Sequence, residues 1–215
     1  MIKCAAIFDF NGTLFWDSHY HSKSWYDFLD AYDIQLSSED INHHIQGRNA
    51  KDIFEFIFKR EFSKAELDQL VEEKESLYRE ECLQNGMALA LGAIELIQYL
   101  KDRKIPIAIA TASRKTNVEF FIEHFELLTY FNRDNIIYDD GKSKGKPHPD
   151  LFLKAIKSLS VNPENVTIFE DSIAGIEAAK RCSVKNVVLV NSSTSNNDKK
   201  VISISDFSDF DRGLL

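Results

Sequence analysis

The sequence predicts an α/β protein with a Rossmann-like parallel-sheet core and an inserted α-helical domain. Two patterns indicate this class. Short apolar runs rich in Ile, Val and Phe alternate with segments of helical periodicity, and one long region interrupts the alternation without a convincing strand. Short strands that are apolar on both faces are typical of parallel sheets covered by helices. The expected strands are 4–8, 106–110, 135–138, 166–169 and 187–190.

The region without strands follows the first expected strand and is predicted to form the inserted domain, residues 16–85. Aromatic residues gather on one face and charged residues on the other in three of its segments, as in amphipathic helices. These expected helices are 24–32, 50–62 and 64–83.

The core is expected to comprise residues 1–15 and 86–215. Periodic segments at 91–101 and 149–159 predict helices that separate its strands. The Ser- and Asn-rich patch at 191–200 predicts a solvated loop.

Composition narrows the possible partners. The chain has 215 residues and a formal net charge of −8, which argues against nucleic acid or an anionic membrane held by bulk electrostatics. No apolar run approaches the roughly 20 residues of a membrane span. Three cysteines, Cys4, Cys82 and Cys182, lie far apart without metal-ligand spacing, so we expect reduced thiols in a cytoplasmic protein.

Four polar clusters each follow an apolar run, and in parallel sheets the carboxyl ends of the strands carry the active site. The first cluster is 9–13, where Asp9 directly follows the first strand. Gly12 indicates a tight turn whose backbone N–H groups would be open to an anion. The alternative for Asp9 is an ordinary helix cap or turn residue.

The second cluster is 111–114. Hydroxyl groups such as those of Thr111 and Ser113 bind phosphate where a strand end opens a helix, and plain N-capping is the alternative. The third cluster centres on Lys146, where neighbouring prolines fix the backbone and would hold the ammonium in place. Such an ammonium neutralises charge on a nucleophile and a phosphoryl group, and an exposed loop lysine is the alternative.

The fourth cluster is the acidic pair Glu170 and Asp171 at the end of a strand. Adjacent carboxylates repel each other unless a cation sits between them, and hard oxygen ligands suit Mg²⁺. Together the four clusters supply a carboxylate nucleophile, a cation site, phosphate binders and a neutralising lysine. These are the components of phosphoryl transfer through an aspartyl-phosphate.

With these four motifs in order, the chain resembles the haloacid dehalogenase superfamily. It is most similar to the subgroup with a small helical cap, which includes β-phosphoglucomutase and phosphoglycolate phosphatase. The resemblance implies that Asp9 is phosphorylated, that Thr111 binds the transferring phosphate and that Lys146 bridges the two. The residues implied to bind phosphate or substrate are Gly12, Thr13, Thr111, Ala112, Ser113 and Arg114. Those implied to hold Mg²⁺ are Asp9, Glu170, Asp171 and the backbone carbonyl of Asn11.

Cap residues follow from the same resemblance. Gly47 and Arg48 fall where related proteins have a substrate-specificity loop, and His21 resembles a histidine near the cap hinge. Gln46 and Ala50 stand about where the mutase has a lysine and an arginine, which weakens the mutase interpretation.

The main departure from the family is Asn11, because its phosphatases and mutases have a second Asp at this position. That Asp protonates the leaving oxygen and then activates the attacking water or hydroxyl, whereas an amide cannot exchange a proton. General acid–base catalysis is worth ~10²–10⁴-fold. Two other branches lack this Asp: Glu170 and Asp171 argue against the dehalogenases, and Lys51 leaves the phosphonate-cleaving branch open.

The protein is therefore expected to be a Mg²⁺-dependent phosphatase of a small phosphorylated metabolite, with a sugar phosphate as the first candidate. Its turnover is expected to be slow because Asn11 replaces the usual acid/base Asp. His21, and after it His19, are the candidates for a substitute acid or base, with ordinary cap residues as the alternative. A β-phosphoglucomutase-like phosphotransferase and a catalytically weak protein that binds a phosphorylated ligand are the alternative functions.

Overall fold

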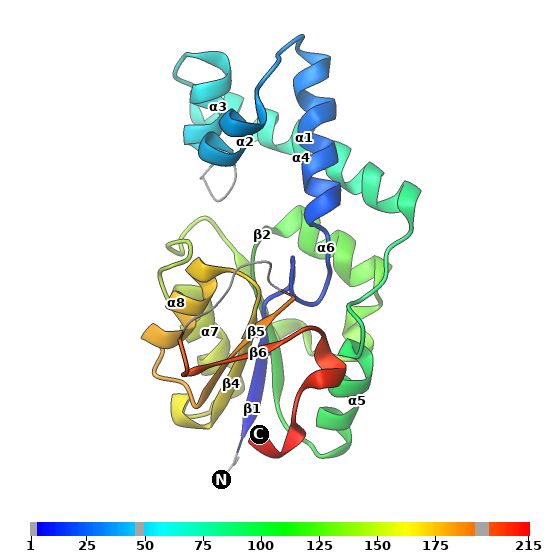
Figure 1. Ribbon diagram of the computed structural model, residues 1–215, viewed down its shortest axis with the longest axis vertical. Helices are drawn as coiled ribbons and strands as arrows, with labels where there is room; N and C mark the ends of the chain where they lie inside the picture. The colour runs from blue at the N-terminus through cyan, green and yellow to red at the C-terminus, as the bar shows by residue number, and fades with distance from the viewer. Residues whose placement is uncertain (1–3, 46–49, 192–197) are drawn as a thin grey trace. The chain divides into compact units, whose positions relative to one another are not determined.

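The computed structural model describes residues 4–45, 50–191 and 198–215. It divides into two compact units, one formed by Met1–Trp16 with Ala88–Leu215 and the other by Asp17–Met87. We call them the core unit and the cap unit (Figure 1). The sequence analysis placed the inserted segment at 16–85.

The core unit contains a six-stranded, all-parallel sheet in the order β3-β2-β1-β4-β5-β6. The central strand β1 pairs with β2 and β4, so that Ile7 lies opposite Ala108 on one side and Ile168 on the other. This confirms the predicted fold class. The strands are β1 (Ala5–Phe8), β2 (Ile107–Arg114), β3 (Ile136–Asp139), β4 (Val166–Glu170), β5 (Asn186–Val190) and β6 (Val201–Ile204).

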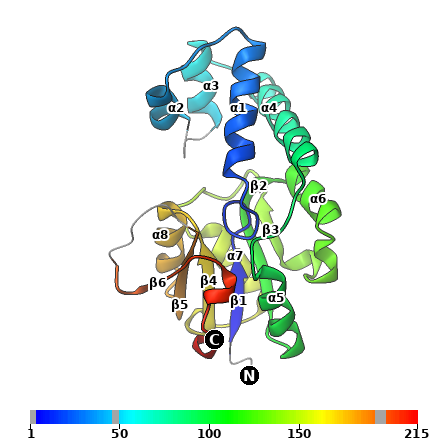
Figure 2. The same ribbon diagram turned by 45° about the vertical axis from the view of Figure 1, so that its right-hand side comes forward.

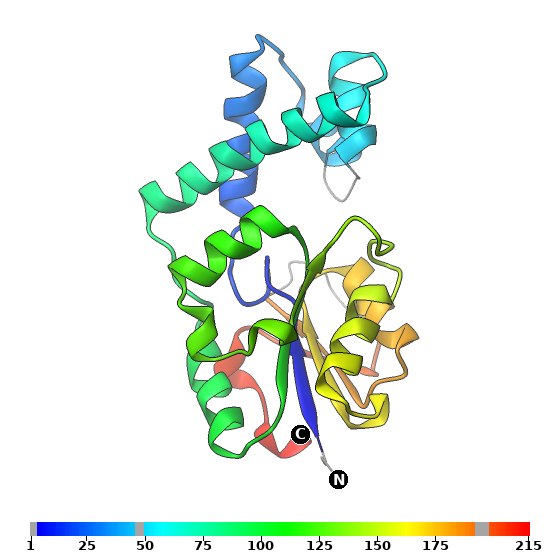
Figure 3. The same cartoon turned by 180° about the vertical axis from the view of Figure 1, so that it is seen from behind.

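Helices cover both faces of the sheet, which is why β1 is buried along its whole length. Figures 2 and 3 show α7 and α8 on one face and α5 and α6 on the other. Ala5 and Ile7 join the apolar cluster beneath α7 and α8, whereas Phe8 stacks on Phe169 and packs against Phe207. The helices are α5 (Ala93–Asp102), α6 (Lys115–His124), α7 (Asp150–Leu159) and α8 (Ile173–Arg181). Short 3₁₀ helices are η1 (Leu127–Thr129), η2 (Arg133–Asn135), η3 (Pro163–Asn165), η4 (Phe207–Asp209) and η5 (Arg212–Leu214).

The secondary structure of the cap unit is helical in its described residues, with α1 (Ser18–Ala31), α2 (Ser38–His44), α3 (Ala50–Phe58) and α4 (Lys64–Asn85). Two of these helices begin at capping boxes, Ser37 with Asp40 and Ser63 with Glu66. Aromatic rings from α1 and α3 form much of its interior, and Phe28 and Phe54 meet edge to face with 5.6 Å between ring centroids.

The remaining expectations concern the cysteines and membrane-spanning segments. Cys4, Cys82 and Cys182 are free thiols, and the last two are buried. Among the described helices none is long and apolar enough to cross a membrane.

Candidate active site

Asp9 directly follows β1 and lies where the carboxyl-terminal ends of the parallel strands meet, which we call the carboxyl edge of the sheet. Its backbone N–H donates to the Phe169 carbonyl at 2.9 Å, which fixes it beside the end of β4. The Asp9 side chain is buried and accepts a hydrogen bond at Oδ1 from Lys146 Nζ. Lys146 Nζ also donates to Glu170 Oε1, so one ammonium group holds two carboxylates. The interpretation of Lys146 as an exposed loop lysine is therefore wrong.

The turn after Asp9 differs from the expectation in one respect. Gly12 N–H donates to the Phe15 carbonyl at 2.7 Å and Thr13 N–H donates to the Phe10 carbonyl at 3.2 Å. The prediction that these groups would be open to an anion is wrong, because the turn itself uses them. The Thr13 hydroxyl instead donates to Asp171 Oδ1 at 3.3 Å.

Gly12 is required by this close approach of Asp171. It has φ +78°, and a Cβ atom there would lie 2.2 Å from Asp171 Oδ2. The turn therefore leaves room for Asp171 and holds it through Thr13.

Glu170 is fixed by the start of α8. Its Oε2 accepts from the Asp171 N–H at 2.6 Å, the Ser172 N–H at 2.7 Å and the Ser172 hydroxyl at 3.0 Å. Ser172 also caps α8 by accepting from the Gly175 N–H at 3.0 Å. A Cβ at Gly175 would lie 1.8 Å from Glu170 Oε1, so this glycine leaves space for the carboxylate. Ser172 belongs to the fourth polar cluster of the sequence but was assigned no role there, although its position directly after the acidic pair and three residues before Gly175 is a helix-start pattern.

Asp9, Glu170 and Asp171 form a carboxylate cluster whose potential ligand atoms all lie within 4.8 Å of one another. Burial raises the pKa of Asp9, which Lys146 opposes and Glu170 reinforces. Burial and the Glu170 and Asp9 carboxylates likewise raise the pKa of Asp171. Buried carboxylates held this close repel each other, and a divalent cation would offset that repulsion. The donor set, all oxygen, fits Mg²⁺.

Lys146 remains the charged partner of this cluster. Burial lowers the pKa of its ammonium, but Asp9 and Glu170 outweigh that effect and raise the pKa above its usual value. Its loop is closed by the His148 N–H, which donates to the Gly145 carbonyl at 3.0 Å, and by the Lys144 N–H, which donates to Asp150 Oδ2 at 3.0 Å.

Asn11 and the end of β2 meet at the same edge. Asn11 Oδ1 accepts from the Ser113 hydroxyl at 2.7 Å and from the Thr111 hydroxyl at 3.2 Å. Thr111 Oγ1 in turn accepts from the Ser113 N–H at 3.0 Å. Thr111 is buried, and Ala112 and Arg114 are exposed on the same segment.

The alternative that Thr111 or Ser113 caps the following helix is wrong. β2 continues to Arg114, with an irregularity in its pairing to β3 between Ala110 and Arg114. Helix α6 begins only at Lys115, and no side-chain hydrogen bond caps it.

The cap unit holds a separate polar cluster beside the predicted His21. Asp17 Oδ2 accepts from the Tyr78 hydroxyl at 2.5 Å and lies 3.3 Å from His21 Nε2. Lys74 Nζ lies 3.0 Å from His21 Nδ1 and donates to Glu75 Oε1 at 3.0 Å. Burial lowers the pKa of Lys74, while the Glu75 carboxylate opposes the shift.

Sequence reasoning missed Lys74 and Tyr78. The signal was present, because Lys74 lies on the buried face of α4 between Val71 and Tyr78 at helical spacing. His19 is exposed and its ring lies 3.8 Å from that of Tyr20. The predicted cap residues Gly47 and Arg48, with Gln46, lie outside the described residues.

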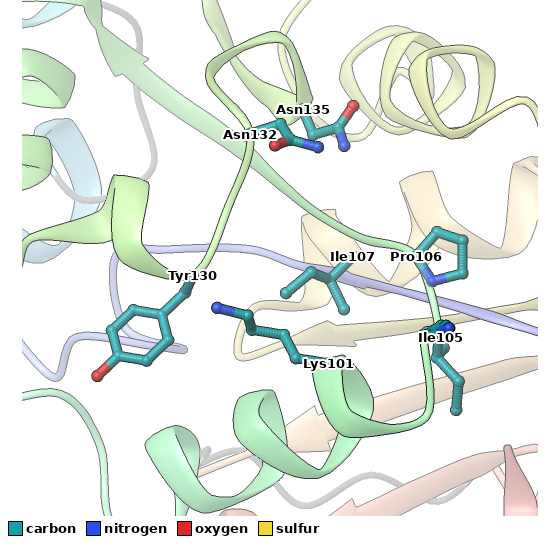
Figure 4. A pocket seen from close by; sticks show the side chains of 8 residues that line it. Lys101, Ile105, Pro106, Ile107, Tyr130, Asn132 and Asn135 are labelled. Carbon is teal, nitrogen blue, oxygen red and sulfur yellow. The ribbon is translucent and has the colours of Figure 1, made fainter.

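A hollow of about 350 Å³ lies at the opposite, amino edge of the sheet (Figure 4). Ile107 at the start of β2 lines it together with Lys101, Tyr130, Asn132 and Asn135. Lys101 Nζ is engaged there, donating to the Thr129 carbonyl at 2.5 Å. None of the candidate catalytic residues contributes to this hollow.

The sequence of this chain is similar to those of known proteins. A model of the family described as haloacid dehalogenase-like hydrolase matches residues 5–183. A phosphorylated carbohydrates phosphatase of Thermotoga maritima is 27% identical over 187 residues, which cover 85% of this chain and 83% of that relative. A β-phosphoglucomutase of Bacillus subtilis is 29% identical over 184 residues, covering 82% of this chain and 78% of that relative.

Among solved structures, a haloacid dehalogenase hydrolase of family IA, variant 3, from Entamoeba histolytica is similar to this chain with a TM-score of 0.90. The two are 34% identical, and the match covers 98% of this chain and 96% of that one. The similarity therefore includes both the sheet and the inserted helices.

Proposed function

The chain belongs to the haloacid dehalogenase-like hydrolase family, and we propose that it is a Mg²⁺-dependent phosphatase of a small phosphorylated metabolite. A sugar phosphate is the first candidate, because the Thermotoga maritima relative is a phosphatase of phosphorylated carbohydrates. The observation that carries the proposal is the position of Lys146 between Asp9 and Glu170, with Asp171 beside them.

Asp9 is the nucleophile of the proposed reaction. An oxygen of its carboxylate attacks phosphorus, the bond to the leaving oxygen breaks, and an aspartyl-phosphate forms. Water then attacks that phosphorus and releases inorganic phosphate and the Asp9 carboxylate. Lys146 favours the ionised form of Asp9 and carries positive charge next to the phosphoryl group. A Mg²⁺ held by Asp9, Glu170 and Asp171 would neutralise charge on the phosphoryl oxygens.

Thr111 and Ser113 have a different part in this scheme. Their hydroxyls donate to Asn11, and through it they fix the turn beside the nucleophile. Thr111 is also the proposed hydroxyl contact of the transferring phosphate.

Asn11 makes the proposed reaction slow. Its amide donates and accepts hydrogen bonds but cannot deliver a proton to the leaving oxygen or remove one from water. The missing proton transfer lowers turnover by ~10²–10⁴-fold. A protein with intact phosphate capture and weak turnover is therefore the second candidate function, and Asn11 is the observation that favours it.

The test is a screen of sugar phosphates and 4-nitrophenyl phosphate with and without Mg²⁺, in the wild type, Asp9→Asn and Asn11→Asp. We expect wild-type turnover that requires Mg²⁺ and is abolished in Asp9→Asn. Asp102→Asn is the matched control, because Asp102 is exposed at the end of α5 and hydrogen-bonds to Gln98. Turnover in Asp9→Asn equal to that of Asp102→Asn contradicts the phosphatase proposal.

Asn11→Asp separates the two candidate functions. A rise in turnover by orders of magnitude identifies the natural protein as a slow phosphatase. Phosphate-dependent thermal stabilisation of the wild type without turnover of any substrate supports the ligand-binding function.

A further inference from the structure

The Asn11 amide affects which phosphorylated substrates the site can use. Resting on the proposed phosphatase function, we propose that Asn11 limits the enzyme to phosphoryl donors whose leaving oxygen departs as a stable anion. Acyl and enol phosphates belong to this class, and phosphate esters of ordinary alcohols do not. Asn11 thereby determines specificity through the acidity of the leaving group rather than through its shape.

Asn11 is held through the oxygen of its side chain. Its side-chain oxygen accepts from both Ser113 and Thr111, at 2.7 and 3.2 Å. Those two bonds commit the carbonyl end of the amide to the protein. An amide in this position has no acidic proton to transfer to a leaving oxygen.

The polar groups around the nucleophile are bound to one another. Lys146 is bound between Asp9 and Glu170, and Glu170 Oε2 accepts three further hydrogen bonds. The Thr13 hydroxyl donates to Asp171. Within the described part of the core unit, these contacts engage the polar groups around Asp9 in holding one another.

Without an acid at position 11, the leaving oxygen departs without a proton. As the Asp9 oxygen bonds to phosphorus, the bond to the leaving oxygen breaks and its electron pair stays on that oxygen. An Asp at position 11 would supply a proton in the same step, whereas here the oxygen leaves as an anion and takes its proton from water later. Phosphoryl transfer has a loose transition state, so much of this charge is present at the barrier.

Leaving-group acidity then decides the rate. The oxygen of an alcohol is about as basic as hydroxide when it leaves as an anion, so its pKa is far above that of a phenol. A phenol has a pKa of about 10 and a carboxylic acid of about 4. A general acid compensates for a basic leaving group, and without it the rate for alcohol esters falls by ~10²–10⁴-fold. Acyl phosphates need no such help, because a carboxylate is stable as it departs.

The second half-reaction predicts a kinetic signature. Release of Asp9 from the aspartyl-phosphate needs no acid, because Asp9 leaves as a carboxylate, but the attacking water lacks a base. For donors with acidic leaving groups this step becomes limiting. We expect a burst of product that is stoichiometric with enzyme, a value of kcat that levels off across these donors, and a kcat/KM that continues to rise.

The experiment measures kcat/KM with saturating Mg²⁺ for aryl phosphates of graded phenol acidity, acetyl phosphate, glucose 1-phosphate and glucose 6-phosphate. In the wild type we expect kcat/KM to fall at least ~10²-fold from 4-nitrophenyl phosphate to the alcohol ester. Asn11→Asp should flatten the series, raising the alcohol ester by ~10²–10⁴-fold and 4-nitrophenyl phosphate by less than about tenfold. Asn162→Asp, an exposed Asn→Asp change at η3, is the matched control and should keep the wild-type slope.

The outcomes separate this inference from the proposed function. A wild-type slope as shallow as that of Asn11→Asp overturns the inference alone and indicates that another group supplies the proton. Absence of turnover for every donor, including acetyl phosphate, overturns the phosphatase function and the inference with it. If Asn11→Asp fails to fold by circular dichroism, the steepness of the wild-type series and its burst still decide the inference.

Discussion

The hydroxyl of Ser113 donates to the side-chain oxygen of Asn11 across 2.7 Å, although the two residues lie 102 positions apart in the sequence. Parallel pairing of β1 with β2 brings them together, because each residue lies just beyond the paired part of its strand. Thr111 shares the same acceptor. The amide in the first loop is therefore held by the second motif, and the two motifs form one functional unit.

Removal of this donor should weaken catalysis without unfolding the protein. In Ser113→Ala, Asn11 loses the Ser113 hydroxyl as a hydrogen-bond partner, a loss of about 1 kcal/mol, so we expect kcat/KM to fall about fivefold. Steady-state kinetics with 4-nitrophenyl phosphate measure this change. Ser158→Ala is the matched control, because Ser158 donates to the Ala155 carbonyl within α7. An equal loss in both variants would contradict a role for Ser113 at the site.

Lys146 should matter for stability as well as for activity. Lys146→Ala leaves the buried carboxylates of Asp9 and Glu170 without their shared cation. Breaking a buried ion pair from one side costs about 3–5 kcal/mol. We expect a loss of this size in the free energy of unfolding, measured by urea denaturation with EDTA present, together with loss of turnover.

Lys154→Ala serves as the control for Lys146→Ala. Lys154 pairs with Asp140 at 3.1 Å on the surface, where solvent screens the interaction. We expect a far smaller change in stability and unchanged metal dependence. Added Mg²⁺ should recover part of the stability of Lys146→Ala, because a divalent cation offsets the repulsion between the remaining carboxylates.

Much of the fold was predictable because two-sided apolar runs mark buried parallel strands. β4 begins at Val166 as predicted, and α7 covers 150–159. Elements with weak apolar patterns were missed. α2 is short and polar, and β6 has only β5 as a neighbour and a mixed burial pattern. The end of β2 was placed at 110, before the polar residues that in fact continue the strand to Arg114.

The components of the site were predictable, but their connections were not. Asp9, Lys146, Glu170 and Asp171 follow strands whose carboxyl ends share one edge, and the structure brings all four together. The bonds from Thr111 and Ser113 to Asn11 depend on which strands are neighbours and on their register, which local sequence does not encode. For the same reason the turn at Gly12 could not be assigned to positioning Asp171.

Gly12 gives a test of that positioning. In Gly12→Ala the new Cβ would lie 2.2 Å from Asp171 Oδ2, and φ is +78°, so both a clash and backbone strain are expected. Gly141→Ala is an unusually close control, because Gly141 has φ +74° and a Cβ added there would have nothing within 4 Å. Strain alone costs about 1–2 kcal/mol and applies to both variants.

The difference between the two glycine variants therefore isolates the contact with Asp171. We expect Gly12→Ala to lower the affinity for Mg²⁺ at least tenfold in metal titrations of activity, and Gly141→Ala to leave it unchanged. Equal Mg²⁺ affinities in the two variants would show that the turn does not position Asp171.

Tyr78 should control how the cap unit responds to alkaline pH. Burial raises the pKa of its hydroxyl far above the usual value of 10, and the Asp17 carboxylate adds to the shift. A group whose pKa is raised by folding stabilises the protein below its unfolded pKa and loses that contribution as the pH rises above it. The Tyr78 contribution is therefore complete at pH 7 and declines above about pH 10.

Tyr78→Phe removes the donor to Asp17 and the titrating group together. At pH 7 we expect a loss of about 1–3 kcal/mol in the free energy of unfolding, because a buried carboxylate loses a hydrogen bond. Above pH 10 the variant should lose less stability than the wild type, so the difference between them narrows. Burial also raises the pKa of Cys82 to about 12. Because Cys82 is present in both proteins, both still lose some stability at alkaline pH.

Urea denaturation of both proteins between pH 7 and pH 11 checks this prediction. Tyr26→Phe is the control, because Tyr26 lies on α1 of the same unit with 53% of its surface exposed. Its unfolding free energy should follow the wild type at every pH. A constant difference between wild type and Tyr78→Phe across the whole range would mean that the Tyr78 hydroxyl does not titrate differently in the folded and unfolded states.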